Sequence, residues 1–352
     1  MNLALISLSI NYDHQEHIYS LYEQLNYNKY QVITIGSSKK IYACSLDKNN
    51  YLVDCPDKPG IEFNTFFLLR IENIINILNK NSIDTILFDT SHVWNLYIIK
   101  RLRKKMHILH IIHDIIPHEG DKNEKGVFLY NKVIAKMVDK IIIHNRKFIN
   151  KFYELYKFNL KNIIYLDLWR YYPQFNNCKE TKQCLFFGRI NKYKGIPALY
   201  QIVKKCSNIN FNIVGRVDND MEKYINPFNS LKNVTLDCSY VNDDKMKEYF
   251  DNADVVILPY ESATQSGVIV DAYKFSRPCI AFDVGAISEQ IENGVSGYLV
   301  EHGNIDAFSE KIIEIIFSNN KSDLCRKAWE FGFEKYSVQR NSERIHDMIQ
   351  DS

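Results

Sequence analysis

No stretch of this sequence reaches the run of about 18 apolar residues that a helix needs to cross a bilayer. The opening segment, MNLALISLSINYDHQEH, has no positively charged start and soon turns polar and acidic, so we expect no secretory signal peptide. No C-x-x-C pair occurs, and the eight cysteines mostly lie in apolar runs, as small buried hydrophobic residues do. These absences predict a cytoplasmic protein with neither a disulfide framework nor a zinc site.

The composition is that of an ordinary globular protein. Hydrophobic residues make up 46% and charged residues 24% of the 352 residues, and this length is sufficient for two domains. The formal net charge is only +2, but residues 1–170 are net basic and the remainder is net acidic.

Two basic segments lie in the first half, KRLRKK (100–105) and RKFINKFYELYKF (146–158), and the second interleaves basic with aromatic residues. This pattern fits a helix lying on an anionic membrane surface, or a solvated helix whose aromatic side chains pack inward. Nucleic acid is a less suitable partner, because a nucleic-acid-binding domain would be more uniformly basic.

Short β-rich runs alternate with helical segments along the chain. The first half contains LALISLSI, QVITIG, TILFD, HILHIIHD and KIIIHN, and after a break near residues 166–183 the pattern restarts with CLFFGRI, FNIVGRV, VTLDCSYV, DVVILPY, PCIAFDV and GYLV. This order predicts an α/β fold of two Rossmann-like, doubly wound domains that face each other across a cleft. We expect the first domain at 1–168, a linker at 169–182 and the second domain at 183–335.

The segment PYESATQSGVIVDAY (259–273) predicts a helix start that can hold an anion. In doubly wound sheets, ligands bind beyond the carboxyl ends of the strands, where helix N-termini present free N–H groups. The amides of Gly267 and Val268 would begin this helix, and Asp271, one turn later, could accept hydrogen bonds from a ribose diol. The alternative is a helix start that is merely capped by a Ser or Thr side chain, without a ligand.

A second segment of the same domain adds two cations. FFGRINKYKG (186–195) follows a strand and leads into a helix, with Arg189 and Lys194 on the connecting loop. A guanidinium and an ammonium group at a strand end can grip a diphosphate. Together with the helix start they favour a ligand site over two unrelated surface charges.

A longer pattern contains both segments. It reads G-R-x-x-x-x-K-G, I-V-G, A-D-V-V-I-L-P-Y, A-Y-x-F-x-x-P-x-I-A-x-D-V-G-A-x-x-E and G-x-x-G-Y-L-V, from about Leu185 to Val300. It resembles the retaining glycosyltransferases with the GT-B fold, similar to glycosyltransferase family 4. HIIHDIIPHEG (110–120) is a weaker match to the strand end that carries the donor-facing histidine of that family. The T-Q-S-G turn and H-D-x-x-P-H resemble one branch of it.

The resemblance implies transfer of a sugar from a nucleoside diphosphate sugar to an acceptor, with retention at the anomeric carbon and without a catalytic metal or other cofactor. It assigns the diphosphate to Arg189 and Lys194 and the transferred sugar to His113. It assigns donor binding to Gly188, Gly215, Arg216, Tyr240, Val241, Glu261, Gln265, Ser266, Gly267, Val268, Asp271 and Glu289. Within this set, residues 215–216 and 240–241 would lie at the nucleobase and Asp271 at the ribose.

Two departures from the family pattern affect these assignments. Seven residues separate two Glu in the family motif, and counting back from Asp271 places the first Glu on Ala263, so its role is taken by Glu261 or Gln265, or is absent. The family's glycine-rich first loop is also missing. In its place stand Asn11, Asp13 and His14. The acceptor side is therefore left open.

Other polar motifs have simpler explanations. VDND (217–220) contains Asp-x-Asp, the metal signature of a different glycosyltransferase fold, but its place after a parallel strand fits a solvated turn. His110, His113 and His118 lack an accompanying carboxylate-rich ligand set, so no metal is predicted, and a buried core histidine is the alternative for His113. Ser91, after TILFD, either caps a helix or lines the acceptor site.

We therefore expect a glycosyltransferase of bacterial-type surface polysaccharide synthesis, such as lipopolysaccharide or capsule, in the cytoplasm or at the inner face of the plasma membrane. The basic first half would suit a lipid-linked acceptor. The alternative is a catalytically weak subunit of the same fold that binds a sugar nucleotide or supports another transferase, for which Ala263 is the motive. By analogy with relatives, residues 336–352 would form a helix that crosses back to the first domain.

Overall fold

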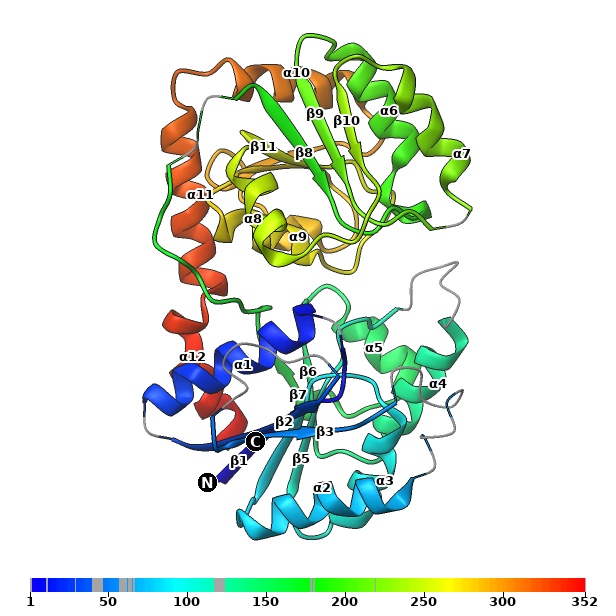
Figure 1. Ribbon diagram of the computed structural model, residues 1–352, viewed down its shortest axis with the longest axis vertical. Coiled ribbons are helices and arrows are strands. Elements are labelled where there is room, and N and C mark those ends of the chain that lie inside the picture. Colours follow the sequence, from blue (N-terminus) through cyan, green and yellow to red (C-terminus); the bar gives the residue numbers. More distant parts are fainter. Residues whose placement is uncertain are drawn as a thin grey trace. The chain divides into compact units, whose positions relative to one another are not determined.

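The computed structural model describes residues 2–10, 12–28, 30–39, 47–56, 62, 65, 67–116, 124–177, 179, 181–218 and 220–351. The chain forms two compact units (Figure 1). Unit 1 comprises Met1–Tyr171 and Val338–Ser352, and unit 2 comprises Tyr172–Ser337. The chain passes from unit 1 to unit 2 inside the segment expected to be a linker, and its last helix belongs to unit 1.

Unit 1 contains a seven-stranded parallel sheet in the order β3-β2-β1-β4-β5-β6-β7 within the described residues. The strands are β1 (Asn2–Ser7), β2 (Gln31–Ser37), β3 (Asn50–Val53), β4 (Thr85–Phe88), β5 (His107–Ile111), β6 (Lys140–Ile143) and β7 (Ile163–Tyr165). Every residue of the central strand β4 is buried. Such burial is expected of parallel strands covered by helices on both faces.

Two helical layers cover this sheet (Figure 1). One layer consists of α2 (Leu68–Lys80), α3 (Val93–Leu102), α4 (Glu124–Ile134) and α5 (Ile149–Tyr156), and the other of α1 (Tyr12–Tyr27) and α12 (Val338–Gln350). Because side chains alternate along a strand, β1 contributes Ala4 and Ile6 to the first core and Leu3 and Leu5 to the second. The C-terminal helix α12 packs beside α1.

Unit 2 contains a six-stranded parallel sheet in the order β10-β9-β8-β11-β12-β13 within the described residues. The strands are β8 (Gln183–Phe187), β9 (Asn210–Val214), β10 (Val234–Asp237), β11 (Val255–Leu258), β12 (Cys279–Phe282) and β13 (Gly297–Val300). The α-helices are α6 (Ile196–Lys205), α7 (Glu222–Ile225), α8 (Asp243–Asp251), α9 (Gly267–Lys274), α10 (Ile305–Ile316) and α11 (Lys321–Tyr336).

The strand order reverses once in each sheet, and this positions the candidate sites. The reversal lies between β1 and β4 in unit 1 and between β8 and β11 in unit 2. Open α/β sheets bind ligands in the crevice at the carboxyl ends of the strands at such a switch point. The loops after β8 and β11, and Asp89 directly after β4, occupy these positions.

Some local expectations were incomplete or wrong. The edge strands β3 and β7 were not predicted, because both are short and partly exposed and therefore lack a long apolar run. The cap of α3 is His92 and not Ser91. The Nδ1 atom of His92 accepts a hydrogen bond from the backbone N–H of Trp94 at 3.1 Å, which fixes the helix start one residue later than expected.

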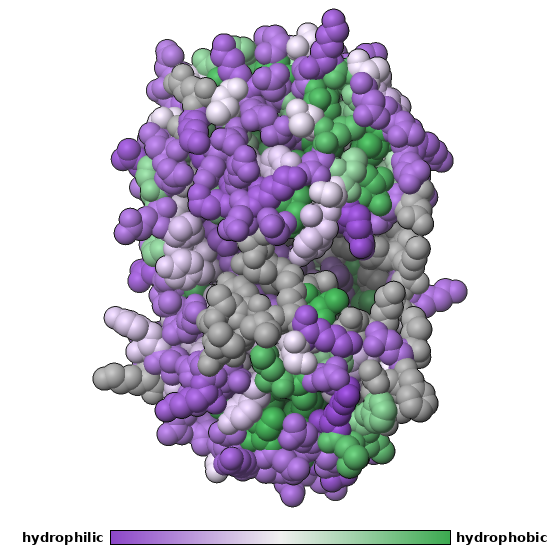
Figure 2. All heavy atoms as spheres, viewed as in Figure 1, coloured by the Kyte–Doolittle hydropathy of each residue, from purple (hydrophilic) through white to green (hydrophobic). Residues whose placement is uncertain are grey.

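The cysteines and the basic segments are placed as follows. Of the described cysteines, Cys238 is exposed, and the buried ones are Cys55, Cys184, Cys206, Cys279 and Cys325. In α5, Phe152 and Tyr156 pack into the core, as expected for a solvated helix whose aromatic side chains point inward. Tyr153 is 47% exposed, as expected for a helix that lies on a membrane surface. Most side chains on the face shown in Figure 2 are hydrophilic. Contact with a membrane surface stays a prediction.

Hydropathy along the helices also bears on the membrane question. Within the described part of the chain, no helix combines the length and apolar character needed to span a bilayer.

Candidate functional site

Two glycine loops meet at the carboxyl edge of the unit 2 sheet. Gly188 follows β8 with a φ of +105°, and Gly215 follows β9 with a φ of +144°, a backbone region that favours glycine. A Cβ atom on Gly215 would lie 2.1 Å from the carbonyl oxygen of Gly188. A Cβ atom on Gly188 would lie 3.5 Å from both Lys194 Nζ and Val268 Cγ2. The Lys194 ammonium group and the first turn of α9 therefore meet at Gly188.

Lys194 is a buried cation. It ends a 3₁₀ turn (Lys192–Lys194), its exposed fraction is 6%, and its Nζ atom donates a hydrogen bond to the Tyr260 hydroxyl and lies 4.0 Å from the centroid of that ring. Burial, with a smaller contribution from the Arg189 guanidinium, lowers the pKa of Lys194 to about 7. No carboxylate among the described residues pairs with it. Buried Lys321, in contrast, lies 3.2 Å from the Asp254 carboxylate.

Arg189 lies on the same loop and is partly exposed. Its Nε atom is 3.7 Å from the Asp218 carboxylate, and the side-chain oxygen of Asn191, turned toward the guanidinium, accepts from Arg189 Nη2 at 3.2 Å. The backbone N–H of Ile190 donates to the carbonyl of Arg216 at 2.9 Å, which ties this loop to the loop after β9. The two predicted diphosphate ligands thus share one neighbourhood, and Asp218 of the Asp-x-Asp motif serves Arg189 as an ionic partner.

The start of α9 is held by a side chain from a distant part of unit 2. Ser266 is the N-cap residue, but its side chain makes no capping hydrogen bond. The Gln290 amide instead accepts from the Ser266 N–H at 2.7 Å and donates to the Ser266 carbonyl at 3.0 Å. The buried Thr264 Oγ1 atom has no hydrogen-bond partner among the described residues. The Gln290 side chain therefore holds the start of α9 in place, and no side-chain cap occupies its first backbone amides.

The hydrogen bonds between Gln290 and Ser266 can be tested by substitution. Replacing Gln290 with leucine would leave the buried N–H of Ser266 without a partner, so the free energy of unfolding should fall by about 2 kcal/mol. Urea denaturation measures this change. An unfolding free energy within about 0.5 kcal/mol of the wild type would show that these hydrogen bonds do not stabilise the helix start.

Ala263, which stands where the family motif has its first Glu, lies at a close backbone contact. Ala263 is buried, its carbonyl accepts the N–H of Ala286 at 3.1 Å, and a Cβ atom on Gly285 would lie 1.8 Å from that carbonyl oxygen. Glu261 is exposed and accepts a hydrogen bond from His302 Nε2 at 2.8 Å. This contact engages the Glu261 carboxylate, and Gln265 is half-buried.

The remaining predicted donor residues lie on neighbouring loops. Arg216 is exposed after β9, and Tyr240, after β10, is 70% exposed. Val241 is half-buried beside it. Asp271 is buried one turn into α9, and Glu289 is half-buried, with its backbone carbonyl accepting from Lys335 Nζ.

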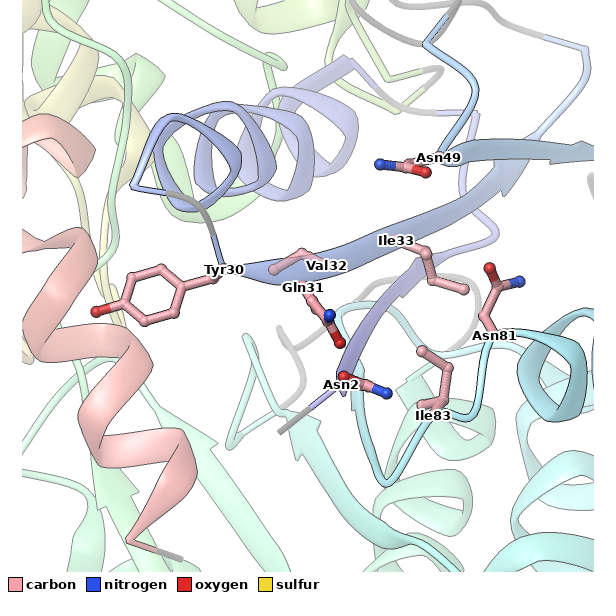
Figure 3. A pocket seen from close by; sticks show the side chains of 8 residues that line it. All are labelled: Asn2, Tyr30, Gln31, Val32, Ile33, Asn49, Asn81 and Ile83. Atoms are coloured by element: carbon pink, nitrogen blue, oxygen red, sulfur yellow. The ribbon is translucent and has the colours of Figure 1, made fainter.

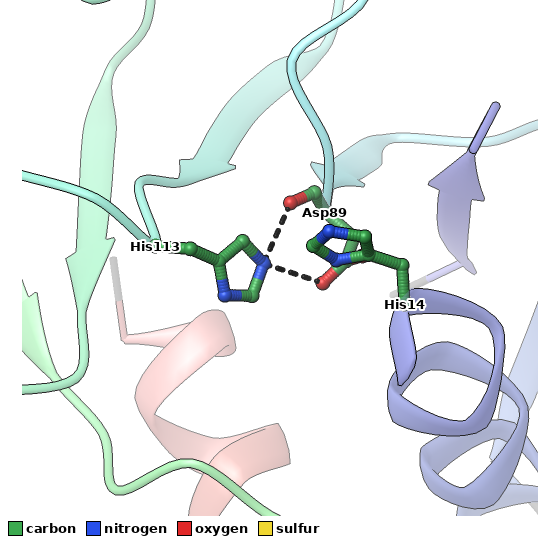
Figure 4. A group of neighbouring side chains, drawn as sticks. All are labelled: His14, Asp89 and His113. Atoms are coloured by element: carbon green, nitrogen blue, oxygen red, sulfur yellow. Dashed lines mark hydrogen bonds and ion pairs between the residues drawn. The ribbon is translucent and has the colours of Figure 1, made fainter. Parts of the chain in front are cut away.

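Unit 1 gathers histidines around Asp89, at the switch point of its own sheet. The carboxylate of Asp89 is fully buried; His17 Nδ1 donates to its Oδ1 atom at 2.7 Å and Ser7 Oγ to its Oδ2 atom at 3.4 Å. His14 Nδ1 lies 3.2 Å from Oδ2, and His113 Nε2 lies 3.2 Å from Oδ1 (Figure 4). His113, predicted to contact the transferred sugar, is thus anchored to Asp89.

Burial and neighbouring charges shift the pKa values of these groups in different directions. Burial lowers the pKa of His17 to about 3, although the Asp89 carboxylate opposes this shift. Burial acts in the same direction on His14, but the hydrogen bond and charge of Asp89 outweigh it and raise the pKa of His14. Burial disfavours the charged form of Asp89, yet His113 and His17 hold its pKa well below the usual range. Asp89 is therefore a buried anion.

Sequence reasoning identified only part of this cluster. His110 is a satisfied core histidine, since Nδ1 lies 2.7 Å from the Ile111 carbonyl and Nε2 lies 3.0 Å from the Tyr130 hydroxyl. His118 and Asn11 lie outside the described residues. Asp89 was missed, although its place at the end of TILFD was a usable signal. Nothing in the local sequence indicates that His17 joins it.

A separate cavity of about 250 Å³ lies at the opposite edge of the unit 1 sheet, where β1 and β2 begin (Figure 3). Its lining consists of Asn2, Tyr30, Gln31, Val32, Ile33, Asn49, Asn81 and Ile83. No charged or histidine side chain is among these lining residues.

Known proteins resemble the chain in sequence. The family profile "Glycosyl transferases group 1" matches residues 181–318. A 41.2 kDa protein from the cps region of Klebsiella pneumoniae is 27% identical over 313 residues, covering 79% of this chain and 80% of that protein. The lipopolysaccharide 1,2-N-acetylglucosaminetransferase of Salmonella typhimurium is 27% identical over 192 residues, covering 51% of this chain and 50% of the enzyme.

The fold also resembles solved structures. Anabaena HepE, solved in complex with UDP, superimposes with a TM-score of 0.73 over 100% of both chains, at 13% sequence identity. A similarity at this low identity concerns the two-domain fold.

Proposed function

Since the chain belongs to the GT-B glycosyltransferases, we propose that it transfers a sugar, with retention of configuration, from a nucleoside diphosphate sugar to a glycan or lipid-linked acceptor of a surface polysaccharide. The relatives named above come from a cps region and from lipopolysaccharide synthesis, which supports a surface polysaccharide as the product.

One observation carries the proposal: Lys194 is a buried cation at the switch point of unit 2 without a carboxylate partner among the described residues. Buried charges in proteins are usually paired, because an unpaired charge loses its hydration without compensation. An anionic ligand between Lys194 and the first amides of α9 would supply that partner. A diphosphate meets this requirement, and UDP is the ligand in the HepE structure.

The other residues complete a donor site. Arg189 would share the diphosphate charge with Lys194, and the Gly267 and Val268 amides would bind phosphate oxygens. Asp271 would accept hydrogen bonds from the ribose, and Tyr240 with Arg216 would flank the base. His113 would contact the transferred sugar from unit 1.

The chemistry follows from this charge distribution. The bond between the anomeric carbon and the diphosphate oxygen breaks, and negative charge develops on a leaving group that Lys194, Arg189 and the α9 dipole stabilise. The acceptor oxygen bonds to the same face of the sugar, and its proton passes to the leaving phosphate. These groups supply the positive charge, so the proposal assigns no metal or other cofactor to the transfer.

A panel of radiolabelled UDP-, GDP- and ADP-sugars tests the proposal. One donor should be slowly hydrolysed or transferred, and proton NMR of the fresh product should show the anomeric configuration of the donor. The alternative function, a binding subunit with little catalysis, rests on Ala263 and on the engagement of Glu261 by His302. Binding of a donor without any turnover would favour it, and failure of every donor to bind would reject both functions.

The lowered pKa of Lys194 predicts a pH dependence of binding. A bound diphosphate would raise that pKa again, so binding takes up a proton at any pH above about 7. The affinity for UDP should therefore fall as the pH rises from 7.5 to 9.5, by up to about tenfold per pH unit, in a range where the phosphate, with a pKa of about 6, stays ionised. Calorimetric titration across this range measures the slope. Lys194→Arg, which stays protonated, should flatten it, and an equal slope in both proteins would contradict this role.

A further inference from the structure

The cavity at the amino edge of the unit 1 sheet is lined by four carboxamide side chains (Figure 3). Asn2 and Gln31 are register partners at the first positions of β1 and β2. Asn49 directly precedes β3, and Asn81 is the C-cap residue of α2. Four segments that lie apart in the chain therefore each bring one carboxamide to the same cavity.

Two of these carboxamides are held in place by the protein itself. Asn2 Nδ2 donates a hydrogen bond to the Ser82 carbonyl at 3.0 Å. Asn81 Nδ2 donates to the Ile77 carbonyl at 2.8 Å. Such contacts fix a side chain before a ligand arrives, so less conformational freedom is lost on binding.

The other two carboxamides are available to a ligand. Within the described part of the chain, the side chains of Gln31 and Asn49 make no hydrogen bond. Gln31 is exposed and Asn49 is half-buried. Each carboxamide offers two N–H donors and a carbonyl acceptor, and a hydroxyl group, which both donates and accepts, can bond to either side of it.

The cavity also has an apolar floor. Ile33 and Ile83 are each 6% exposed and lie between the side chains of Gln31 and Asn81 in Figure 3. A concave apolar surface with a few convergent polar groups is the usual form of a small-molecule site. The volume of about 250 Å³ is below the roughly 300–1,000 Å³ of sites for drug-sized ligands, so the cavity suits one small ring.

A charged or planar aromatic ligand fits this lining poorly. The described lining residues include no charged side chain, which a phosphate or carboxylate group would require. Tyr30 is their one aromatic residue, and its ring lies 3.6 Å from that of His346, centroid to centroid. One face of the Tyr30 ring is therefore covered, and Figure 3 shows the ring turned toward α12, away from the carboxamides.

We propose that this cavity binds one neutral sugar residue of a glycan. Hydroxyl groups of the sugar bond to Gln31 and Asn49, and its ring C–H groups pack on Ile33 and Ile83. The six residues of β1, at about 3.3 Å per residue, separate the cavity by roughly 20 Å from the carboxyl edge where Asp89 lies. Binding here requires neither the donor site of unit 2 nor the transfer reaction.

An NMR titration of the full chain, with the asparagine side-chain amides labelled with ¹⁵N, tests the proposal. The probes are glucose, galactose, mannose, N-acetylglucosamine and N-acetylgalactosamine, each added alone. The Asn49 side-chain resonance, identified by its absence from Asn49→Leu, should shift with at least one of these sugars and saturate at millimolar concentration. Addition of UDP should not reverse the shift, because the proposed donor site lies in unit 2.

Gln31→Leu and Asn76→Leu form a matched pair of variants. Gln31→Leu should weaken sugar binding by about three- to tenfold, as expected for the loss of one hydrogen bond. Asn76 is exposed on α2 and is not among the lining residues, so Asn76→Leu should leave the affinity unchanged. Both residues are exposed, so both variants should fold, and circular dichroism checks this. An Asn49 resonance that none of the sugars shifts, a shift that UDP reverses, or equal affinities in Gln31→Leu and Asn76→Leu would overturn the proposal.

Discussion

Replacing Lys194 with methionine should lower the rate of sugar transfer by on the order of 10²–10³-fold. The Lys194 ammonium group lies beside Gly188, as does the first turn of α9, and negative charge would develop there on the leaving diphosphate. Methionine keeps the apolar stem and fills most of the volume, so the Tyr260 ring retains a packing partner. Initial rates with the donor selected from the nucleotide-sugar panel measure the effect.

Lys192 provides the control for this variant. It stands on the same 3₁₀ turn but is exposed, so Lys192→Met changes the net charge by the same amount without touching the proposed site. Its transfer rate should stay within about twofold of the wild type, as expected for a surface substitution. Equal rates for Lys194→Met and the wild type would contradict the assignment of Lys194 to the diphosphate.

The second large effect is expected at Gly195, in the loop that carries Lys194. Gly195 has a φ of +68°, and a Cβ atom there would lie 1.7 Å from the carbonyl oxygen of Pro259, at the end of β11. Gly195→Ala adds backbone strain of about 1–2 kcal/mol and forces this junction apart, so the free energy of unfolding should fall by about 3 kcal/mol or more. Because the junction joins Lys194 to Tyr260, UDP affinity should fall as well.

The variant Gly294→Ala separates backbone strain from the steric clash as causes of this loss of stability. Its φ of +75° is similar, but a Cβ atom there would meet no heavy atom within 4 Å. Gly294→Ala should therefore cost only the backbone strain of about 1–2 kcal/mol and leave UDP affinity intact. Urea denaturation of both variants gives the comparison, and equal destabilisation would show that the Gly195–Pro259 contact is not tight.

The sequence predicted most of the fold because parallel strands covered on both faces are continuous apolar runs. The runs TILFD and DVVILPY became β4 and β11, and the predicted two-domain GT-B fold is confirmed. The edge strands β3 and β7 escaped because partial exposure removes that signal. His92 caps α3 because of its side-chain conformation, and the composition of the sequence does not predict that conformation.

The candidate site was predictable where its residues share a loop. Arg189 and Lys194 lie five residues apart, and Ser266, Gly267 and Val268 are contiguous, so their clustering is already present in the sequence. The contacts of Gln290 with Ser266 and of His17 with Asp89 join residues 24 and 72 positions apart. Such pairs require the tertiary packing. The roles of the individual donor residues, the retaining mechanism and the T-Q-S-G branch stay predictions.

A crystal structure of the full chain with UDP tests the central claim most directly. We predict diphosphate oxygens within hydrogen-bonding distance of Lys194 Nζ and of the backbone nitrogens of Gly267 and Val268, with the guanidinium of Arg189 turned toward the same phosphates. A well-ordered UDP whose phosphates lie away from α9, with Lys194 still bonded only to the Tyr260 hydroxyl, would contradict the account.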